Sequence, residues 1–135
     1  TSVGSAVASN SPVLLITGDL SFFYDINGLW NNYIKSDFRI ILINNGGGGI
    51  FRILPGHENN EIFSKFIETK HSLKAKKIAQ LYGFNYQNKK TKWGIKLALK
   101  TFFNKSKKPK ILEITTPSDL SSETLKNYFE FLSKN

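Results

Sequence analysis

Short runs of aliphatic and β-branched residues, bounded by polar segments, occur at three places in the chain. They cover residues 13–17, 39–43 and 111–115, so each has the length of one strand. An apolar run that does not alternate with polar residues is typical of a strand covered on both faces, as in a parallel sheet. We therefore expect three buried parallel strands, with a shorter one at residues 84–86.

The segments between and after these runs repeat apolar residues at the period of an α-helix. Trp30 and Trp93 lie on such apolar faces and are expected in the core. Strands alternating with helices predict an α/β fold: an open, mostly parallel sheet with helices on both faces, joined by right-handed crossovers. Residues 1–135 are expected to form one domain. The predicted helices cover residues 22–34, 72–82 (capped by Ser72 and stopped by Gly83), 93–103 and 121 onward, with a helix end in 1–10 and a short helix or turn in 61–66.

Composition narrows the class of protein. The 135 residues include no cysteine, which excludes disulfides, thiolate zinc sites and a cysteine nucleophile. No apolar run approaches the ~18–20 residues of a membrane span, and the first residues lack the features of a signal peptide. Methionine is also missing, so we expect a processed or excised piece of a larger protein.

The formal net charge of +9 is unevenly distributed. Thirteen lysines and no acidic residue lie between Lys70 and Lys110. Such a block can bind nucleic acid or an anionic membrane. However, Arg39 and Arg52 are the only arginines, and arginine dominates base and phosphate recognition. Abundant Asn, Ile and Phe favour an AT-rich coding bias, so we expect solvated helix faces and no nucleic-acid partner.

Polar residues follow the first two predicted strands. Asp19 comes after the first strand and Asn45 after the second, 26 positions later. The carboxyl ends of parallel strands form the ligand-binding edge of such a sheet. Carboxylate and amide oxygens suit Mg²⁺ or Ca²⁺. The four glycines at 46–49 permit close backbone approach and N–H contacts to an anion. The pattern indicates a Mg²⁺-bridged diphosphate or polyphosphate site, with a tight turn that binds no ligand as the alternative.

Two known phosphate-binding motifs do not fit. Phe51 replaces the third glycine of the dinucleotide fingerprint, and no Gly-Lys-Ser/Thr sequence is present. Instead, Gly-Asp-Leu at 18–20 with Asn-Asn at 44–45 resembles the thiamin diphosphate motif. The longer segments 18–29 and 44–55 resemble those of the menaquinone-pathway 2-succinyl-5-enolpyruvyl-6-hydroxy-3-cyclohexene-1-carboxylate synthases, the MenD family. This resemblance extends over essentially the whole chain.

The resemblance implies roles for individual residues. Asp19, the Asn45 side chain and the Gly47 carbonyl are expected to hold Mg²⁺, with Mn²⁺ or Ca²⁺ as possible substitutes. Arg52 replaces the small polar residue that we expect in the family; it either contacts an anionic substrate or is a solvated loop arginine. The other expected contacts are Gly18, Leu20, Ser21 and Gly48 to the diphosphate, Ile50 and Phe51 to the cofactor rings or the substrate, and Leu54 to the apolar side of the active site.

The resemblance also implies that the chain is a C-terminal fragment of a larger enzyme. Its reaction is the decarboxylation of 2-oxoglutarate and addition of the product carbanion to isochorismate. The missing N-terminal pyrimidine-binding and central domains would complete a cytoplasmic dimer or tetramer. This fragment carries no catalytic residue and is expected to be inactive alone. Two alternatives remain: the same domain of another thiamin diphosphate enzyme, such as a 2-oxoacid decarboxylase or acetolactate synthase, and a non-enzymatic basic anion- or nucleic-acid-binding module.

Overall fold

The computed structural model describes residues 1–53 and 61–134. The chain divides into two compact units. The first, which we call the sheet unit, comprises Thr1–Ile43 and Lys74–Thr115. The second, the loop unit, comprises Asn44–Leu73 and Thr116–Asn135 and contains the glycine run. Each unit is described by itself.

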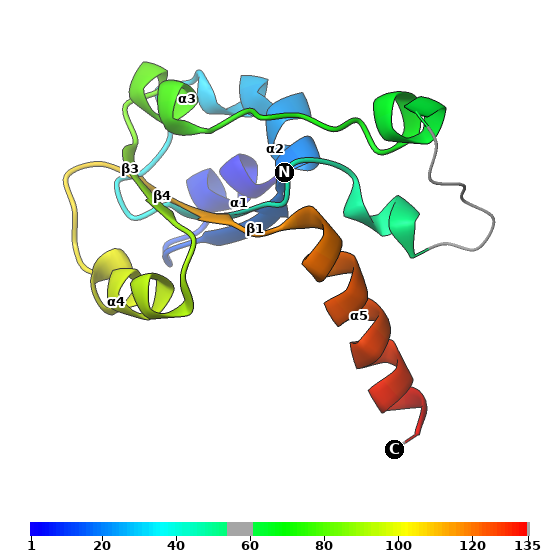
Figure 1. Ribbon diagram of the computed structural model, residues 1–135. Coiled ribbons are helices and arrows are strands. Elements are labelled where there is room, and N and C mark those ends of the chain that lie inside the picture. Colours follow the sequence, from blue (N-terminus) through cyan, green and yellow to red (C-terminus); the bar gives the residue numbers. More distant parts are fainter. Residues whose placement is uncertain (54–60, 135) are drawn as a thin grey trace. The chain divides into compact units, whose positions relative to one another are not determined.

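Four strands form the sheet: β1 (Leu14–Gly18), β2 (Arg39–Asn44), β3 (Asn85–Lys89) and β4 (Lys110–Thr115). Their spatial order is β1-β2-β4-β3 (Figure 1). The pairs β1–β2 and β3–β4 are parallel. The bounds of all three strong strand predictions are therefore confirmed within one residue at each end. The expected burial on both faces is wrong for β1, where Leu14 is 41% exposed and Ile16 is 64% exposed. The fourth strand covers residues 85–89 instead of 84–86, because its polar sequence gives only a weak strand signal.

Helices cover both faces of this sheet, as the alternation predicts (Figure 1). On one face, α1 (Ser2–Ala8), α2 (Asp19–Tyr24), the 3₁₀ turn η1 (Ile26–Leu29) and α3 (Lys76–Leu81) bury an apolar cluster centred on Phe38, Ile40 and Leu42. On the other face, α4 (Lys92–Phe102) packs Ala98 and Phe102 against Leu112. The α/β prediction is confirmed.

The predicted helix over residues 22–34 is wrong in its bounds. Helix α2 begins at Asp19 and ends at Tyr24, and η1 follows it. Asp25, Asn27 and Gly28 have low helix propensity, which accounts for the interruption. The two tryptophans are also not in the core of the described structure: Trp30 is 73% exposed and Trp93 is 74% exposed.

Helix α3 starts at Lys76, four residues after the predicted Ser72 cap. The N-cap position belongs to Ala75, whose backbone N–H donates to Oε2 of Glu113 on β4 at 3.0 Å. The capping acceptor therefore comes from the sheet. The predicted stop at Gly83 is confirmed, since this glycine has a φ of +75°.

The loop unit contains a 3₁₀ turn, η2 (Gly49–Arg52), a π-helical turn, η3 (Phe63–Ile67), and α5 (Ser118–Ser133). Helix α5 begins three residues before the predicted start at Ser121. The helix is amphipathic as expected. On its apolar face, however, Tyr128, Phe129 and Leu132 are each at least half exposed. Among the described residues, no helix is long and apolar enough to cross a membrane.

Candidate cofactor site

Asp19 lies where the chain passes from strand β1 into helix α2. Gly18 ends β1 in an extended conformation and is the N-cap of α2, so Asp19 is the first residue of that helix. Its side chain is 3% exposed, and Oδ1 accepts the Leu20 N–H at 2.8 Å. The sequence thus places a buried carboxylate at a helix N-terminus, where backbone N–H groups favour negative charge.

The strand register fixes which edge carries this carboxylate. Leu14 is opposite Arg39 at one end of the β1–β2 pair, and Gly18 is opposite Ile43 at the other. Both strands therefore end at the same edge of the sheet. Ligands of open α/β sheets bind at this edge.

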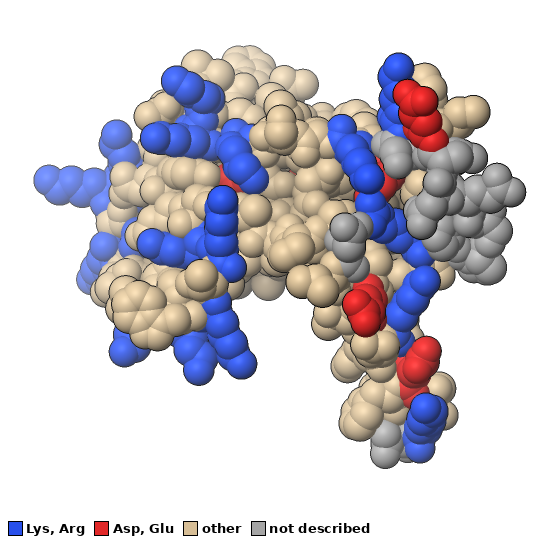
Figure 2. Space-filling model, viewed as in Figure 1, with Lys and Arg blue, Asp and Glu red and all other residues tan. Residues whose placement is uncertain are grey.

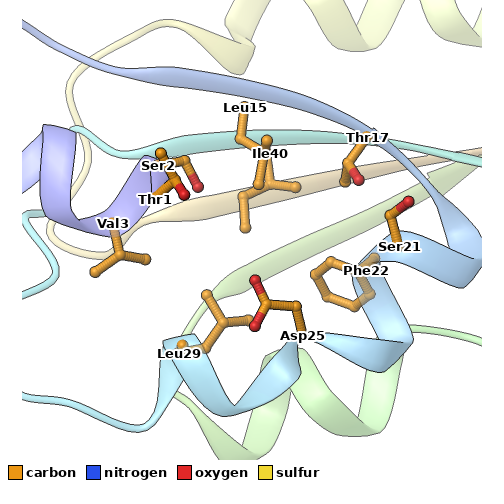
Figure 3. A pocket seen from close by; sticks show the side chains of 11 residues that line it. Thr1, Ser2, Val3, Leu15, Thr17, Ser21, Phe22, Asp25, Leu29 and Ile40 are labelled. Atoms are coloured by element: carbon orange, nitrogen blue, oxygen red, sulfur yellow. The ribbon is translucent and has the colours of Figure 1, made fainter.

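A hollow of about 400 Å³ in the sheet unit lies between α1, β1 and the α2–η1 segment (Figure 3). Thr17, Ser21 and Asp25 give it polar lining, and Phe22 and Leu29 give it apolar lining. The expected contact of Ser21 with the diphosphate stays a prediction.

In the loop unit, Asn44 starts the glycine run with an Asx turn. Its Oδ1 accepts the Gly46 N–H at 3.1 Å, and its Nδ2 donates to the Leu73 carbonyl at 2.9 Å. The side chain is 1% exposed. This structural role was missed in the sequence, although an asparagine two residues before a glycine is a signal for such a turn. Asn45 is half-buried, and its role as a metal ligand stays a prediction.

The first two glycines of the run are required by the backbone. Gly46 and Gly47 have φ values of +79° and +155°, which side-chain-bearing residues rarely adopt. A Cβ atom added at Gly47 would lie 2.9 Å from the main-chain oxygen of Glu68. The Gly48 N–H donates to this same oxygen at 2.7 Å, and the His71 N–H donates to the Gly46 carbonyl at 3.0 Å. Residues 68–71 therefore run directly alongside the glycine turn.

The remaining glycines make room for neighbouring side chains. A Cβ atom at Gly48 would lie 2.9 Å from the Phe51 ring, and one at Gly49 would lie 2.6 Å from the Asn45 amide nitrogen. Ile50 is 53% exposed and Phe51 is 37% exposed. These two apolar groups are thus accessible to a ligand. Leu54, named in the sequence analysis, lies outside the described residues.

Arg52 is not a solvated loop arginine. Its Nε donates to Oε1 of Glu68 at 2.6 Å and its Nη2 donates to Oε2 at 3.1 Å. The Glu68 side chain is 1% exposed, whereas the Arg52 side chain is 15% exposed. Ser118 donates to Glu68 Oε1 at 3.2 Å, and Lys70 lies 3.6 Å from Oε2. Sequence reasoning missed Glu68, because no local pattern marks it.

The donor chemistry fits a magnesium–diphosphate group. The described residues contain no group of three or more His, Cys, Asp or Glu side chains that would hold a metal by themselves. The sheet unit offers the Asp19 carboxylate, and the loop unit offers the Asn45 amide oxygen and the Gly47 carbonyl. Each by itself is a hard oxygen ligand of the kind that Mg²⁺ prefers. The glycine turn leaves space where a Cβ would otherwise be. These features define an α/β domain of the diphosphate-binding class.

Comparison with known proteins gives the family. Residues 1–114 match the family described as the thiamine pyrophosphate enzyme, C-terminal TPP binding domain, and the chain belongs to this family. The chain is 56% identical over 132 residues to a 2-succinyl-5-enolpyruvyl-6-hydroxy-3-cyclohexene-1-carboxylate synthase of Christiangramia forsetii. It is 51% identical over 132 residues to the protein of the same name in Flavobacterium psychrophilum.

These similarities include nearly all of the chain but a small part of each relative. Both synthases align with 98% of the chain, which spans 23% and 24% of their lengths. Among solved structures, a thiamine diphosphate-dependent 4-hydroxybenzoylformate decarboxylase of Rhodococcus jostii RHA1 matches 86% of the chain with a TM-score of 0.62 and 25% identity. The chain spans 22% of that protein. The family resemblance and the fold predicted from the sequence are thus confirmed.

Proposed function

We propose that the chain is the magnesium- and diphosphate-binding domain of a 2-succinyl-5-enolpyruvyl-6-hydroxy-3-cyclohexene-1-carboxylate synthase. The whole enzyme decarboxylates 2-oxoglutarate and adds the product carbanion to isochorismate in menaquinone biosynthesis. The observation that carries this proposal is the glycine turn: Gly46 and Gly47 adopt positive φ, and residues 68–71 leave no room there for a side chain. The named relatives, at 51–56% identity, support this synthase over another thiamin diphosphate enzyme.

Within the proposal, Asp19, the Asn45 side chain and the Gly47 carbonyl hold Mg²⁺. Backbone groups of Gly18, Leu20, Ser21 and Gly48 bind the diphosphate, and Ile50 and Phe51 contact the rings or the substrate. When bound, thiamin diphosphate supplies the carbanion-stabilising chemistry of the reaction. The chain's own residues bind and orient the charged end of the cofactor. The position of Asp19 directly after β1 supports this role, because ligands of open α/β sheets bind at the carboxyl ends of the strands.

The partners in this proposal are the N-terminal pyrimidine-binding domain and the central domain of the same enzyme. Thiamin diphosphate sites of the resembling enzymes lie between domains of two subunits, so the full enzyme is proposed to be a cytoplasmic dimer or tetramer. The difference in length between the chain and its relatives supports the need for these further domains.

The test is Asp19→Asn in the full-length enzyme. We expect Mg²⁺-dependent binding of thiamin diphosphate to fall by at least about 100-fold, because the substitution removes the single charged ligand of the proposed set. The matched control is Glu123→Gln, an equal loss of charge at an exposed position of α5. Isothermal titration with Mg²⁺ and cofactor measures both. Cofactor affinity in Asp19→Asn equal to that of the control would refute the metal assignment.

The same preparation distinguishes this synthase from the alternative, another thiamin diphosphate enzyme that acts on 2-oxoacids. The unmodified enzyme is assayed with 2-oxoglutarate and isochorismate, and separately with pyruvate and other 2-oxoacids. Formation of the succinyl adduct of isochorismate supports the synthase. Turnover of pyruvate without any use of isochorismate supports a decarboxylase or acetolactate synthase instead.

A further inference from the structure

Arg52 and Glu68 form a buried ion pair beside the glycine turn, and the proposed ligand set includes neither residue. We infer that these two side chains are positioning residues. Together they hold the main chain of residues 46–49 in the shape that presents the Gly47 carbonyl to Mg²⁺. The inference rests on the proposed function of that turn, and it assigns Arg52 a task other than contact with an anionic substrate.

The first step is the strength of the pair. Two separate hydrogen bonds, Nε to Oε1 at 2.6 Å and Nη2 to Oε2 at 3.1 Å, join the planar guanidinium of Arg52 to both oxygens of Glu68. Such a bidentate arrangement fixes orientation as well as distance. Glu68 is 1% exposed, so water does not replace a lost partner easily. The Ser118 hydroxyl adds a third hydrogen bond at 3.2 Å.

The second step links Glu68 to the turn through its main chain. The Glu68 carbonyl accepts the Gly48 N–H at 2.7 Å. It would also lie 2.9 Å from a Cβ at Gly47 and 3.3 Å from one at Gly48. Because this oxygen is in contact with the turn, a displacement of Glu68 must displace Gly47 or Gly48.

The third step is that Arg52 belongs to the other end of the same turn. It is the last residue of η2 (Gly49–Arg52), which directly follows the glycines. These connections form a closed ring. The main chain joins Gly48 to Arg52 through η2, the ion pair joins Arg52 to Glu68, and the hydrogen bond from the Gly48 N–H joins Glu68 back to Gly48. Removing either charged side chain opens this ring at the same place.

The fourth step is that segment 68–71 depends on such support. Thr69 has a φ of +53°, in the left-handed region that is uncommon for residues other than glycine. Hydrogen bonds to Gly48 and Gly46 lie on either side of it, at residues 68 and 71. A strained segment persists where its surroundings hold it, and the ion pair supplies one such constraint.

The experiment uses the full-length enzyme and the variants Arg52→Gln, Glu68→Gln and Arg52→Gln/Glu68→Gln. Lys126→Gln and Glu123→Gln on α5 are controls that make the same charge changes at exposed positions. Mg²⁺ affinity at a fixed thiamin diphosphate concentration is measured by titration of intrinsic fluorescence. Melting temperature without cofactor and the KM of each substrate are also measured.

Each single variant is expected to weaken Mg²⁺ affinity by about 10- to 100-fold, the usual effect of losing a residue that orients a metal ligand. The controls are expected to retain wild-type affinity. Because both residues belong to one ring, their effects are not expected to add. The Mg²⁺ affinity of the double variant is expected to be no lower than that of the more impaired single variant. The double variant also leaves no unpaired charge buried, so it keeps the test valid if a single variant folds poorly.

Two results would overturn the inference. One is a raised KM for an anionic substrate in Arg52→Gln with wild-type Mg²⁺ affinity, which would make Arg52 a substrate contact. The other is a lowered melting temperature in all three variants with unchanged Mg²⁺ affinity, which would make the pair merely stabilising. If the unmodified enzyme binds no thiamin diphosphate, the proposed function fails. Wild-type affinity in the variants of a binding enzyme defeats this inference alone.

Discussion

Asn44 and Asn45 are neighbours in the sequence but have different surroundings. Asn44 is 1% exposed, and its amide is hydrogen-bonded to Gly46 and Leu73. Asn45 is half-buried, with its amide nitrogen beside Gly49. Asn44 therefore shapes the turn, and the metal-ligand role of Asn45 stays a prediction from the motif. A sequence motif identifies such a pair, but hydrogen-bond geometry is needed to divide the two roles.

Among the glycines of the described residues, Gly47 is the one at which a positive φ coincides with an added Cβ closer than 3.0 Å to another atom. Gly47→Ala is expected to destabilise the chain by about 1–3 kcal/mol, because the new Cβ meets the Glu68 carbonyl at a strained φ. Urea unfolding of the 135-residue chain measures this. The control is Gly4→Ala, inside α1, where nothing lies within 4 Å of an added Cβ. This control is expected to stabilise by about 0.5–1 kcal/mol. Equal effects at both positions would contradict the description of the turn.

At the scale of elements, the sequence predicted those helices and strands whose bounds depend on nearby residues. The three apolar strands and α4 were found within one residue, because the apolar period of each lies wholly inside the element. Elements that depend on distant partners were not found. The start of α3 depends on Glu113, 38 positions away, and the geometry of Arg52 depends on Glu68, 16 positions away. For the same reason, sequence reasoning named a ligand set, which stays a prediction, and missed the Arg52–Glu68 ion pair beside the turn.

Glu113 also ties β3 to β4. The Tyr86 hydroxyl donates to Oε2 of this buried carboxylate at 2.5 Å. Burial, followed by the hydrogen bond and the negative charge of Glu113, raises the pKa of Tyr86 above its ordinary value of about 10. Because the folded-state pKa is the higher one, this contribution to stability is full below about pH 10 and is lost as the pH rises through the folded-state value.

Tyr86→Phe is therefore expected to lower the free energy of unfolding by about 1–3 kcal/mol at pH 7, through loss of a hydrogen bond to a charged group. The difference from wild type is expected to stay constant up to about pH 10 and to shrink above it. Urea unfolding at a series of pH values measures this difference. Tyr24→Phe, at a tyrosine that is 75% exposed, is the control and should stay within about 0.5 kcal/mol of wild type. A difference for Tyr86→Phe that does not change with pH would be inconsistent with a raised pKa.

At the scale of the whole molecule, the lysines of the basic block are mostly exposed to solvent. Of the thirteen lysines from Lys70 to Lys110, eleven are exposed, and Lys89 and Lys110 are half-buried. Figure 2 shows blue side chains scattered around α3, β3 and α4 with neutral surface between them. Arg39 is 4% exposed and donates to main-chain carbonyls. With Arg52 paired to Glu68, both arginines are committed within their own units. This supports the expectation of solvated lysines.

The length of the chain relative to its relatives bears on what it does alone. It spans about a quarter of the length of its named relatives, and our assignment gives it binding residues but no catalytic one. The aminopyrimidine end of the cofactor is proposed to lie against another domain. The isolated chain is therefore expected to form no product from 2-oxoglutarate and isochorismate, even at saturating Mg²⁺ and thiamin diphosphate, because half of the proposed cofactor site is absent.

Mass-spectrometric detection of the succinyl adduct checks this expectation. The full-length enzyme is the positive control, and its Asp19→Asn variant is the matched negative control, since it keeps every domain but lacks the proposed metal carboxylate. We expect product from the full-length enzyme only. Product from the isolated chain above the level of the Asp19→Asn enzyme would show that these 135 residues contain a complete catalytic site. In that event, both the proposed division of the cofactor between domains and the absence of catalytic residues here would be wrong.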